Sequence, residues 1–266
     1  MYRMPELMRV TVCQLDNRPG HRTEAIAALA DHARAAGADL VLLPEMPFST
    51  WLGADPEPDA ARWLHSVDEH RRVLAGLAFE DAAVIGSMPT AEPNGSWLNQ
   101  AFVWNEASGA AAIRAKHYLP DEPGYWEATW YDRAEASQAT CRVGRARVGV
   151  SICTEMWFLH TASRYAKLGV DLLCVPRVTP EETLAKWLAG GQATAVCSGA
   201  YCLSSNQWVP EQPGIAAGGL GWAIDPDGNV LATTSPGEPF VTVEVDLDLA
   251  RQAKRTYPRY VAGLER

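Results

Sequence analysis

Residues 39–45 read DLVLLPE, an uninterrupted apolar run that ends with a carboxylate at Glu45. A run of this length is typical of a strand that is covered on both faces. A second run, VGVSIC, covers residues 148–153 and stops at Cys153. Two such strands predict a mixed α/β fold, and in open α/β sheets functional side chains gather at the carboxyl ends of the strands.

The segments around these two runs alternate between helical and extended patterns. Early helices and late hairpins suggest two packed sheets with helices outside. Composition does not shift along the chain, so we expect a single domain over residues 1–266. We expect helices at 21–36, 60–79, 157–168 and near 180–197, strands at 82–88, 99–105, 109–118, 171–176 and 201–206, a hairpin at 141–153, and a β-rich last third.

Composition excludes several classes of function. The 266 residues are 47% hydrophobic and 21% charged, and the formal net charge is -9, which argues against a nucleic-acid partner. No stretch approaches the roughly 20 apolar residues of a membrane span, and the N-terminus does not resemble a secretory signal. The six cysteines form no CxxC pair, so we expect reduced thiols in a cytoplasmic protein.

Three residues stand at strand ends and could carry chemistry. Cys153 precedes an expected helix, where a thiol would be shifted toward the nucleophilic thiolate, although a buried structural cysteine is the alternative. Glu45 is either a solvated strand end or a general base for that thiol. Lys116 closes the expected strand 109–118 and is either a solvated lysine or a group that stabilises negative charge on an intermediate.

The segments that hold these residues resemble the signatures of one family. DLVLLPE, AKHYLPDEPGYWE at residues 115–127 and GVSICTEMWF at residues 149–158 look like the three motifs of the nitrilase (carbon–nitrogen hydrolase) superfamily. Their order and spacing also fit, and AIDPDGNVLA at residues 223–232 resembles a further family segment. The similarity therefore covers nearly the whole chain.

This resemblance implies a four-layer α-β-β-α sandwich whose protomers pair into a homodimer or a higher homo-oligomer. It implies that Glu45 is the base, Lys116 the charge stabiliser and Cys153 the nucleophile. It also implies that the backbone N–H of Thr154 helps to form the oxyanion site. No metal or organic cofactor is implied.

Many family members carry a second glutamate after the lysine. The stretch that ends at Glu127 is similar to the carbamoylputrescine amidase-like branch, so we assign this role to Glu127. Glu122 is the alternative, and it could equally be an exposed loop charge.

Three further residues are candidates for substrate binding. Arg177 follows the expected strand 171–176 and could hold a substrate carboxylate, although a surface arginine or an internal ion pair is the alternative. Trp126 and Trp157 could form a pocket wall, although tryptophans more often belong to a core or an interface. The six histidines show no metal-ligand spacing.

The expected reaction is hydrolysis of a non-peptide carbon–nitrogen bond in a small amide or N-carbamoyl substrate, through a cysteine thioester. A nitrilase is the near alternative, because Glu155 stands two residues after the nucleophile as in nitrilases. A metal-dependent phosphoesterase would need a ligand cluster that we do not find. A catalytically silent small-molecule binding protein would be expected to have lost one of the three residues, and all are present. The expected partner is a small molecule, with neither nucleic acid nor membrane.

Overall fold

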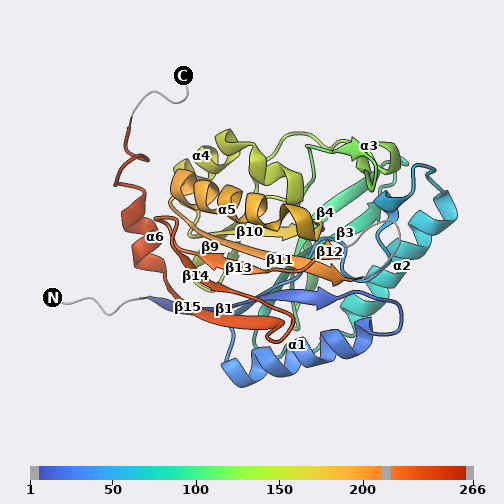
Figure 1. Cartoon of the computed structure of the whole chain (residues 1–266), viewed down its shortest axis with the longest axis horizontal. Coiled ribbons are helices and arrows are strands. Elements are labelled where there is room, and N and C mark those ends of the chain that lie inside the picture. The colour runs from blue at the N-terminus through green and yellow to red at the C-terminus, as the bar shows by residue number, and fades with distance from the viewer. Residues whose placement is uncertain (1–5, 211–216, 262–266) are drawn as a thin grey trace.

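Two β-sheets pack face to face at the centre of the molecule, and helices cover their outer faces (Figure 1). The computed structural model describes residues 6–210 and 217–261. The first sheet contains, in spatial order, β5 (Gly109–Ala115), β4 (Trp97–Asn105), β3 (Ala83–Ala91), β2 (Leu40–Leu42), β1 (Leu7–Asp16) and β15 (Phe240–Asp246). The second contains β8 (Thr140–Val143), β9 (Ala146–Val150), β10 (Leu172–Arg177) and β11 (Tyr201–Val209), with β12 (Ala217–Gly218), β13 (Trp222–Ile224) and β14 (Val230–Thr233) beyond β11.

The central strands of each sheet run parallel, and this sets where their side chains emerge. β1, β2 and β3 are parallel neighbours, as are β9, β10 and β11. β1 and β11 also pair in parallel where Gln14–Asp16 meets Asn206–Trp208, which joins the two sheets at the carboxyl ends of their strands. The segments that follow β2 and β9 therefore emerge at the same end of the sandwich.

Each outer face of the sandwich carries its own pair of helices. α1 (Arg22–Ala36) and α2 (Ala60–Ala75) pack on the first sheet, and Leu29 and Leu74 belong to the apolar cluster beneath them. α4 (Leu159–Lys167) and α5 (Leu184–Ser198) cover the second sheet, as Figure 1 shows. The shorter elements are η1 (Leu52–Ala54), β6 (Asp121–Glu122), β7 (Tyr125–Trp126), α3 (Glu127–Trp130), η2 (Cys153–Trp157), η3 (Glu181–Thr183) and α6 (Leu247–Ala253).

The main core lies between the two sheets. Val10 and Leu42 from the first sheet share one buried cluster with Val148, Leu172 and Leu203 from the second. Alternate side chains of a strand point to opposite faces, so each central strand contributes apolar residues to this core and to the helix-covered face. The expected α-β-β-α sandwich is confirmed.

The structure corrects some expected boundaries. Residues 157–168 were expected to be one helix, but η2 ends before Phe158, whose backbone (φ -90°, ψ 76°) leaves the helical region, and α4 begins at the next residue. The expected helix 60–79 ends at Ala75, with Gly76 as its cap. The expected strand 109–118 ends at Ala115, so Lys116 follows the strand instead of closing it.

Close packing of α4 on β9 fixes the strand that leads to Cys153. A Cβ atom on Gly149 would lie 2.9 Å from two ring carbons of Tyr165. Tyr165 is buried, and its hydroxyl donates a hydrogen bond of 2.8 Å to the carbonyl oxygen of Val150. The ring is held both by packing and by this bond, so it has little room to move.

We expect Gly149→Ala to lower the free energy of unfolding by about 1–3 kcal/mol, because overpacking forces a buried ring or the strand to shift. Urea unfolding measures the change. Gly237→Ala is the matched control, since a Cβ there meets no atom within 4 Å, and we expect its stability to stay the same or rise slightly. Equal stability of the two variants would contradict this account of the β9–α4 contact.

Candidate active site

Three side chains from separate parts of the chain converge at the carboxyl ends of the strands. Glu45, Lys116 and Cys153 follow β2, β5 and β9, and all three are buried. The Lys116 Nζ atom donates a hydrogen bond of 2.8 Å to Glu45 Oε1. The charges of Glu45 and Lys116 both act on the pKa of the Cys153 thiol. The structure therefore brings together the carboxylate, the ammonium and the thiol that the sequence singles out.

A second carboxylate completes the surroundings of the ammonium. Glu127, the first residue of α3, is fully buried, and its Oε2 atom lies 2.5 Å from Lys116 Nζ. The Tyr131 hydroxyl, one helical turn later, donates a hydrogen bond to the same oxygen. Glu122 instead lies exposed on β6. Of the two glutamates that the sequence offered for this position, Glu127 is the one beside Lys116.

Burial raises the pKa of a carboxyl and lowers the pKa of an ammonium, and the attraction between the two groups opposes both shifts. Burial raises the pKa of the Glu127 carboxyl to about 8, although Lys116 opposes the rise. Burial lowers the pKa of the Lys116 ammonium, but Glu127 and Glu45 together outweigh burial and raise it above the ordinary value of lysine. Lys116 is therefore a fixed positive charge at neutral pH.

Asn99 and Tyr131 were not identified from the sequence. Asn99, on β4, donates a hydrogen bond of 2.7 Å from Nδ2 to Glu45 Oε1, and it is buried. Its signal is a polar side chain two residues before buried Ala101, so both lie on the same face of the strand. The signal of Tyr131 is its spacing of four residues from Glu127, which places both on one side of a helix.

The thiol differs from expectation in one respect. We expected the pKa of Cys153 to be lowered at a helix start, but η2 is a five-residue 3-10 helix and the thiol is buried beside Glu45. Burial and the Glu45 charge raise the pKa of the thiol well above its ordinary value, and Lys116 only partly opposes them. The Sγ atom contacts the carbonyl oxygen of Val178 at 3.7 Å.

Left-handed backbone occurs at both strand ends. Cys153 has φ 49°, and Met46, directly after Glu45, has φ 43°. Residues other than glycine avoid this region, and each such residue costs about 1–3 kcal/mol. Both chain segments therefore turn sharply where they leave the sheets, and the surrounding packing must maintain these turns.

One buried carboxylate links the Lys116 segment to the Cys153 segment. Glu155 forms a bidentate ion pair with Arg114 of β5, one contact of which is 2.7 Å. The same carboxylate accepts backbone hydrogen bonds of 2.8 Å from the N–H groups of His117 and Ile152. Residues on either side of Lys116 and on either side of Cys153 are thus tied through one side chain.

A cavity of about 430 Å³ opens beside the nucleophile. Cys153 and Thr154 line it, together with Tyr125. Trp157 and Trp187 form one wall, with ring centroids 5.1 Å apart. The exposed side chains that complete the lining include Glu122 and Lys186, so both charges are available at its rim.

Two expected substrate-binding residues are not among those that line this cavity. Arg177 is fully buried, and its guanidinium donates hydrogen bonds to Ser204, Thr179 and Leu220 and stacks over the Trp222 ring at 4.1 Å. Its hydrogen-bonding groups therefore serve the protein interior. Half-buried Trp126 lies on β7 and packs in the apolar cluster that contains Trp51, Trp63 and Trp130.

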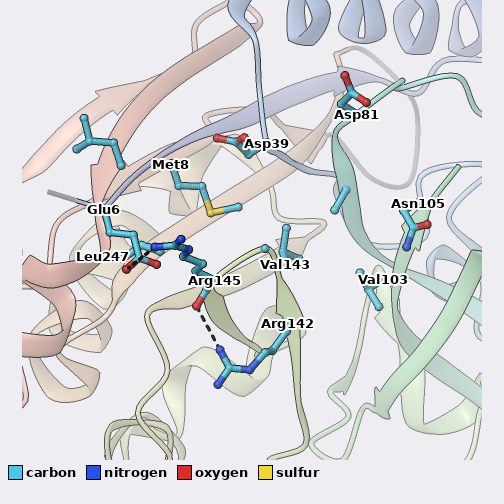
Figure 2. Close-up of a pocket in the computed structure, with 13 residues that line it drawn as sticks. Glu6, Met8, Asp39, Asp81, Val103, Asn105, Arg142, Val143, Arg145 and Leu247 are labelled. Carbon is cyan, nitrogen blue, oxygen red and sulfur yellow. Dashed lines mark hydrogen bonds and ion pairs between the residues drawn. The ribbon is translucent and has the colours of Figure 1, made fainter. Parts of the chain in front are cut away.

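A second cavity, of about 360 Å³, lies near the amino ends of β1 and β3 (Figure 2). Several of its polar groups already have partners: Glu6 lies 2.8 Å from Arg251, which is outside the lining, and 3.9 Å from Arg145, and the Arg145 carbonyl accepts a hydrogen bond from Arg142. The residues that line it include no cysteine, lysine or histidine. Chemistry based on Glu45, Lys116 and Cys153 therefore belongs to the first cavity.

Among residues 6–210 and 217–261, no group of three or more histidine, cysteine, aspartate or glutamate side chains is arranged to hold a metal ion. In the same part of the chain, no helix combines the length and the apolar composition that a membrane crossing needs.

An αββα sandwich with a thiol, an ammonium and two carboxylates gathered at its strand ends is the architecture of the nitrilase superfamily of hydrolases. The chain belongs to the carbon–nitrogen hydrolase family, whose model matches residues 9–255. It is 29% identical to the glutamine-dependent NAD(+) synthetase of Rhodobacter capsulatus in an alignment of 267 residues that covers 96% of this chain but only 46% of that protein. The chain thus spans about half the length of this relative.

Solved structures agree on the fold. A carbon–nitrogen hydrolase from Helicobacter pylori G27 superposes with a TM-score of 0.84 at 20% identity, covering 96% of this chain and 94% of that one. A variant amidase from Nesterenkonia sp. AN1 superposes with a TM-score of 0.74 at 23% identity, covering 92% of both chains. That structure shows covalent addition of the acetamide moiety of fluoroacetamide at the active-site cysteine of the amidase.

We expect Glu155→Gln to lower the free energy of unfolding by about 3–5 kcal/mol, because it leaves the buried Arg114 guanidinium without a counter-charge. Chemical denaturation measures the loss. Glu244→Gln is the matched control: Glu244 pairs with Arg9 at 3.6 Å on the surface with 49% of its side chain exposed, so we expect less than about 1 kcal/mol. Similar losses in both variants would refute the linking role of Glu155.

Proposed function

We propose that the protein hydrolyses a carbon–nitrogen bond in a small amide or N-carbamoyl compound through a thioester on Cys153. The observation that supports this most is the buried ammonium of Lys116, which lies between Glu45 and Glu127 and acts electrostatically on a thiol that lines a cavity. A fixed positive charge in a water-poor site is suited to stabilising an oxyanion.

In the first half of the proposed reaction, Glu45 takes the thiol proton as the Cys153 sulfur bonds to the amide or ureido carbon. Lys116 and the backbone N–H of Thr154 stabilise the oxyanion that forms on the substrate oxygen. When this intermediate collapses, the carbon–nitrogen bond breaks and the leaving nitrogen receives the proton held by Glu45. Ammonia or an amine departs, and the acyl group remains on sulfur.

In the second half, Glu45 takes a proton from water as the water oxygen attacks the thioester carbon. The new oxyanion is stabilised as before. The carbon–sulfur bond then breaks, the sulfur regains a proton from Glu45, and the acid product leaves. The raised pKa of the Cys153 thiol supports proton removal during attack rather than a preformed thiolate, and this gives Glu45 a defined task.

An amide or N-carbamoyl substrate is preferred here over a nitrile. Glu155 is the residue that suggests a nitrilase, but its carboxylate accepts hydrogen bonds from Arg114 and from the backbone N–H groups of His117 and Ile152. Two similar proteins also support an amide substrate: the Nesterenkonia protein is an amidase, and the NAD(+) synthetase depends on glutamine, which carries a side-chain amide.

Ammonia release from a panel of amides, N-carbamoyl amines and acids, and matching nitriles tests this choice. Release from the nitriles alone would overturn it, and turnover of no compound would favour a silent binding protein.

We expect Cys153→Ala to abolish ammonia release from any substrate that the wild type accepts, while a chelator such as EDTA leaves the wild-type rate unchanged. Cys197→Ala, at a half-buried cysteine on α5, is the control and should keep full activity. Activity that survived in Cys153→Ala, or that disappeared with EDTA, would rule out the proposed chemistry.

We also propose that the protein forms a homodimer or a higher homo-oligomer through the α4 layer. Trp157 and Leu159 are large apolar side chains at the start of this layer, with 40% and 39% of their surfaces exposed. Exposed apolar residues of this kind are frequent at subunit interfaces.

We expect Leu159→Glu to shift the protein toward monomers in sedimentation velocity experiments. A glutamate at the first position of α4 is compatible with the helix, so the fold should be retained. Leu64→Glu, at a leucine that is 48% exposed on α2 of the opposite layer, is the control and should leave the oligomer intact. A monomeric wild type would contradict the proposal.

A cytoplasmic location is also proposed. All six cysteines of the chain lie within the described residues and are free, as is usual in a reducing compartment.

A further inference from the structure

We propose that Tyr125 is a substrate-contacting residue whose hydroxyl donates a hydrogen bond to the acyl oxygen of the substrate. This inference rests on the proposed amide hydrolysis. Tyr125 lies on β7, two residues before Glu127, and lines the same cavity as Cys153 and Thr154. Tyr125 has no part in the proposed roles of the base, the ammonium and the nucleophile.

The Tyr125 hydroxyl has no hydrogen-bond partner in the described structure. The Tyr125 oxygen is buried, yet it has no hydrogen-bond partner among residues 6–210 and 217–261. A buried polar group without a partner is destabilising, so such groups are rare unless a ligand or water completes them. The neighbouring Tyr131 hydroxyl provides the contrast, because it donates to Glu127. Of these two hydroxyls, the unpartnered one belongs to the residue that lines the cavity.

The Tyr125 ring is held in place without its hydroxyl. Tyr125 packs against Trp51, with ring centroids 6.4 Å apart. The Trp51 indole N–H in turn donates a hydrogen bond of 3.0 Å to the carbonyl oxygen of Gly124, the residue directly before Tyr125. β6 and β7 pair, and this fixes the same turn. The hydroxyl thus has a defined position that does not depend on any bond of its own.

The Tyr125 hydroxyl also keeps its proton. Burial raises the pKa of Tyr125 well above that of free tyrosine, and negative charge on nearby groups adds to the rise. Cys153 at the start of η2 contributes when it is ionised, and Glu182 on η3, Glu45 after β2 and Glu122 on β6 contribute as carboxylates. A tyrosine that stays neutral at all working pH values can donate a hydrogen bond to a substrate oxygen throughout the reaction.

The test compares Tyr125→Phe with Tyr131→Phe, two variants that each remove one hydroxyl from the same region. For the amide that the wild type hydrolyses best, we expect Tyr125→Phe to lower kcat/KM roughly 100- to 1000-fold, as for loss of one donor to a developing oxyanion. Its midpoint of urea unfolding should stay the same or rise, because no folded-state bond is lost. Tyr131→Phe should lower that midpoint, because Glu127 loses a donor.

A measurement that needs no turnover separates this inference from the proposed function. Chloroacetamide carries an amide oxygen and alkylates thiols, whereas iodomethane has no oxygen acceptor. We expect Tyr125→Phe to slow alkylation of Cys153 by chloroacetamide at least several-fold relative to alkylation by iodomethane, as followed by mass spectrometry.

The same ratio of the two alkylation rates in the wild type and in Tyr125→Phe would overturn the role of Tyr125. An unchanged kcat/KM with a lowered unfolding midpoint would also overturn it. Absence of all amide turnover in the wild type would refute the proposed function, while the alkylation ratio would still report on Tyr125.

Discussion

The site depends on one buried ammonium that is held by two buried carboxyl groups. Lys116 has no exposed surface, and its Nζ atom donates hydrogen bonds to Glu45 and Glu127, which arrive from the end of β2 and the start of α3. Removing Lys116 would leave the two buried carboxyl groups without a counter-charge, which is strongly destabilising. The sandwich therefore has to hold three distant segments of chain together before any substrate arrives.

Glu155 extends the same constraint to the nucleophile. Its carboxylate joins Arg114 and the backbone of His117 to the turn that begins at Ile152, so the ammonium and the thiol cannot move independently. Burial keeps the thiol neutral at rest, and the cluster supplies both a nearby base and a fixed positive charge for the moment of attack. The same contacts that stabilise the fold thus define the proposed chemistry.

Sequence reasoning located this site because its principal members stand next to strongly apolar strands. DLVLLPE and VGVSIC each point to a buried strand, and motif similarity linked them to Lys116 and Glu127. Asn99 and Tyr125 were missed, since a single polar residue within a strand or an irregular loop carries little signal. Arg177 stands at a strand end too, but that position does not determine which way a side chain points, and its guanidinium lies among Ser204, Thr179 and Leu220. The pKa of the thiol depends on burial, which no local pattern reveals.

The left-handed backbone at Met46 and Cys153 implies a trade-off between the stability of this protein and its rate of catalysis. Both residues lie where the chain leaves a central strand, and both conformations would relax if the local structure opened. Substitutions that relieve the backbone strain, such as Met46→Gly, would be favoured by selection for thermal stability alone. They would also make the orientation of the Glu45 side chain less fixed. Selection for catalytic rate should therefore retain the left-handed backbone, although it lowers the stability of the fold.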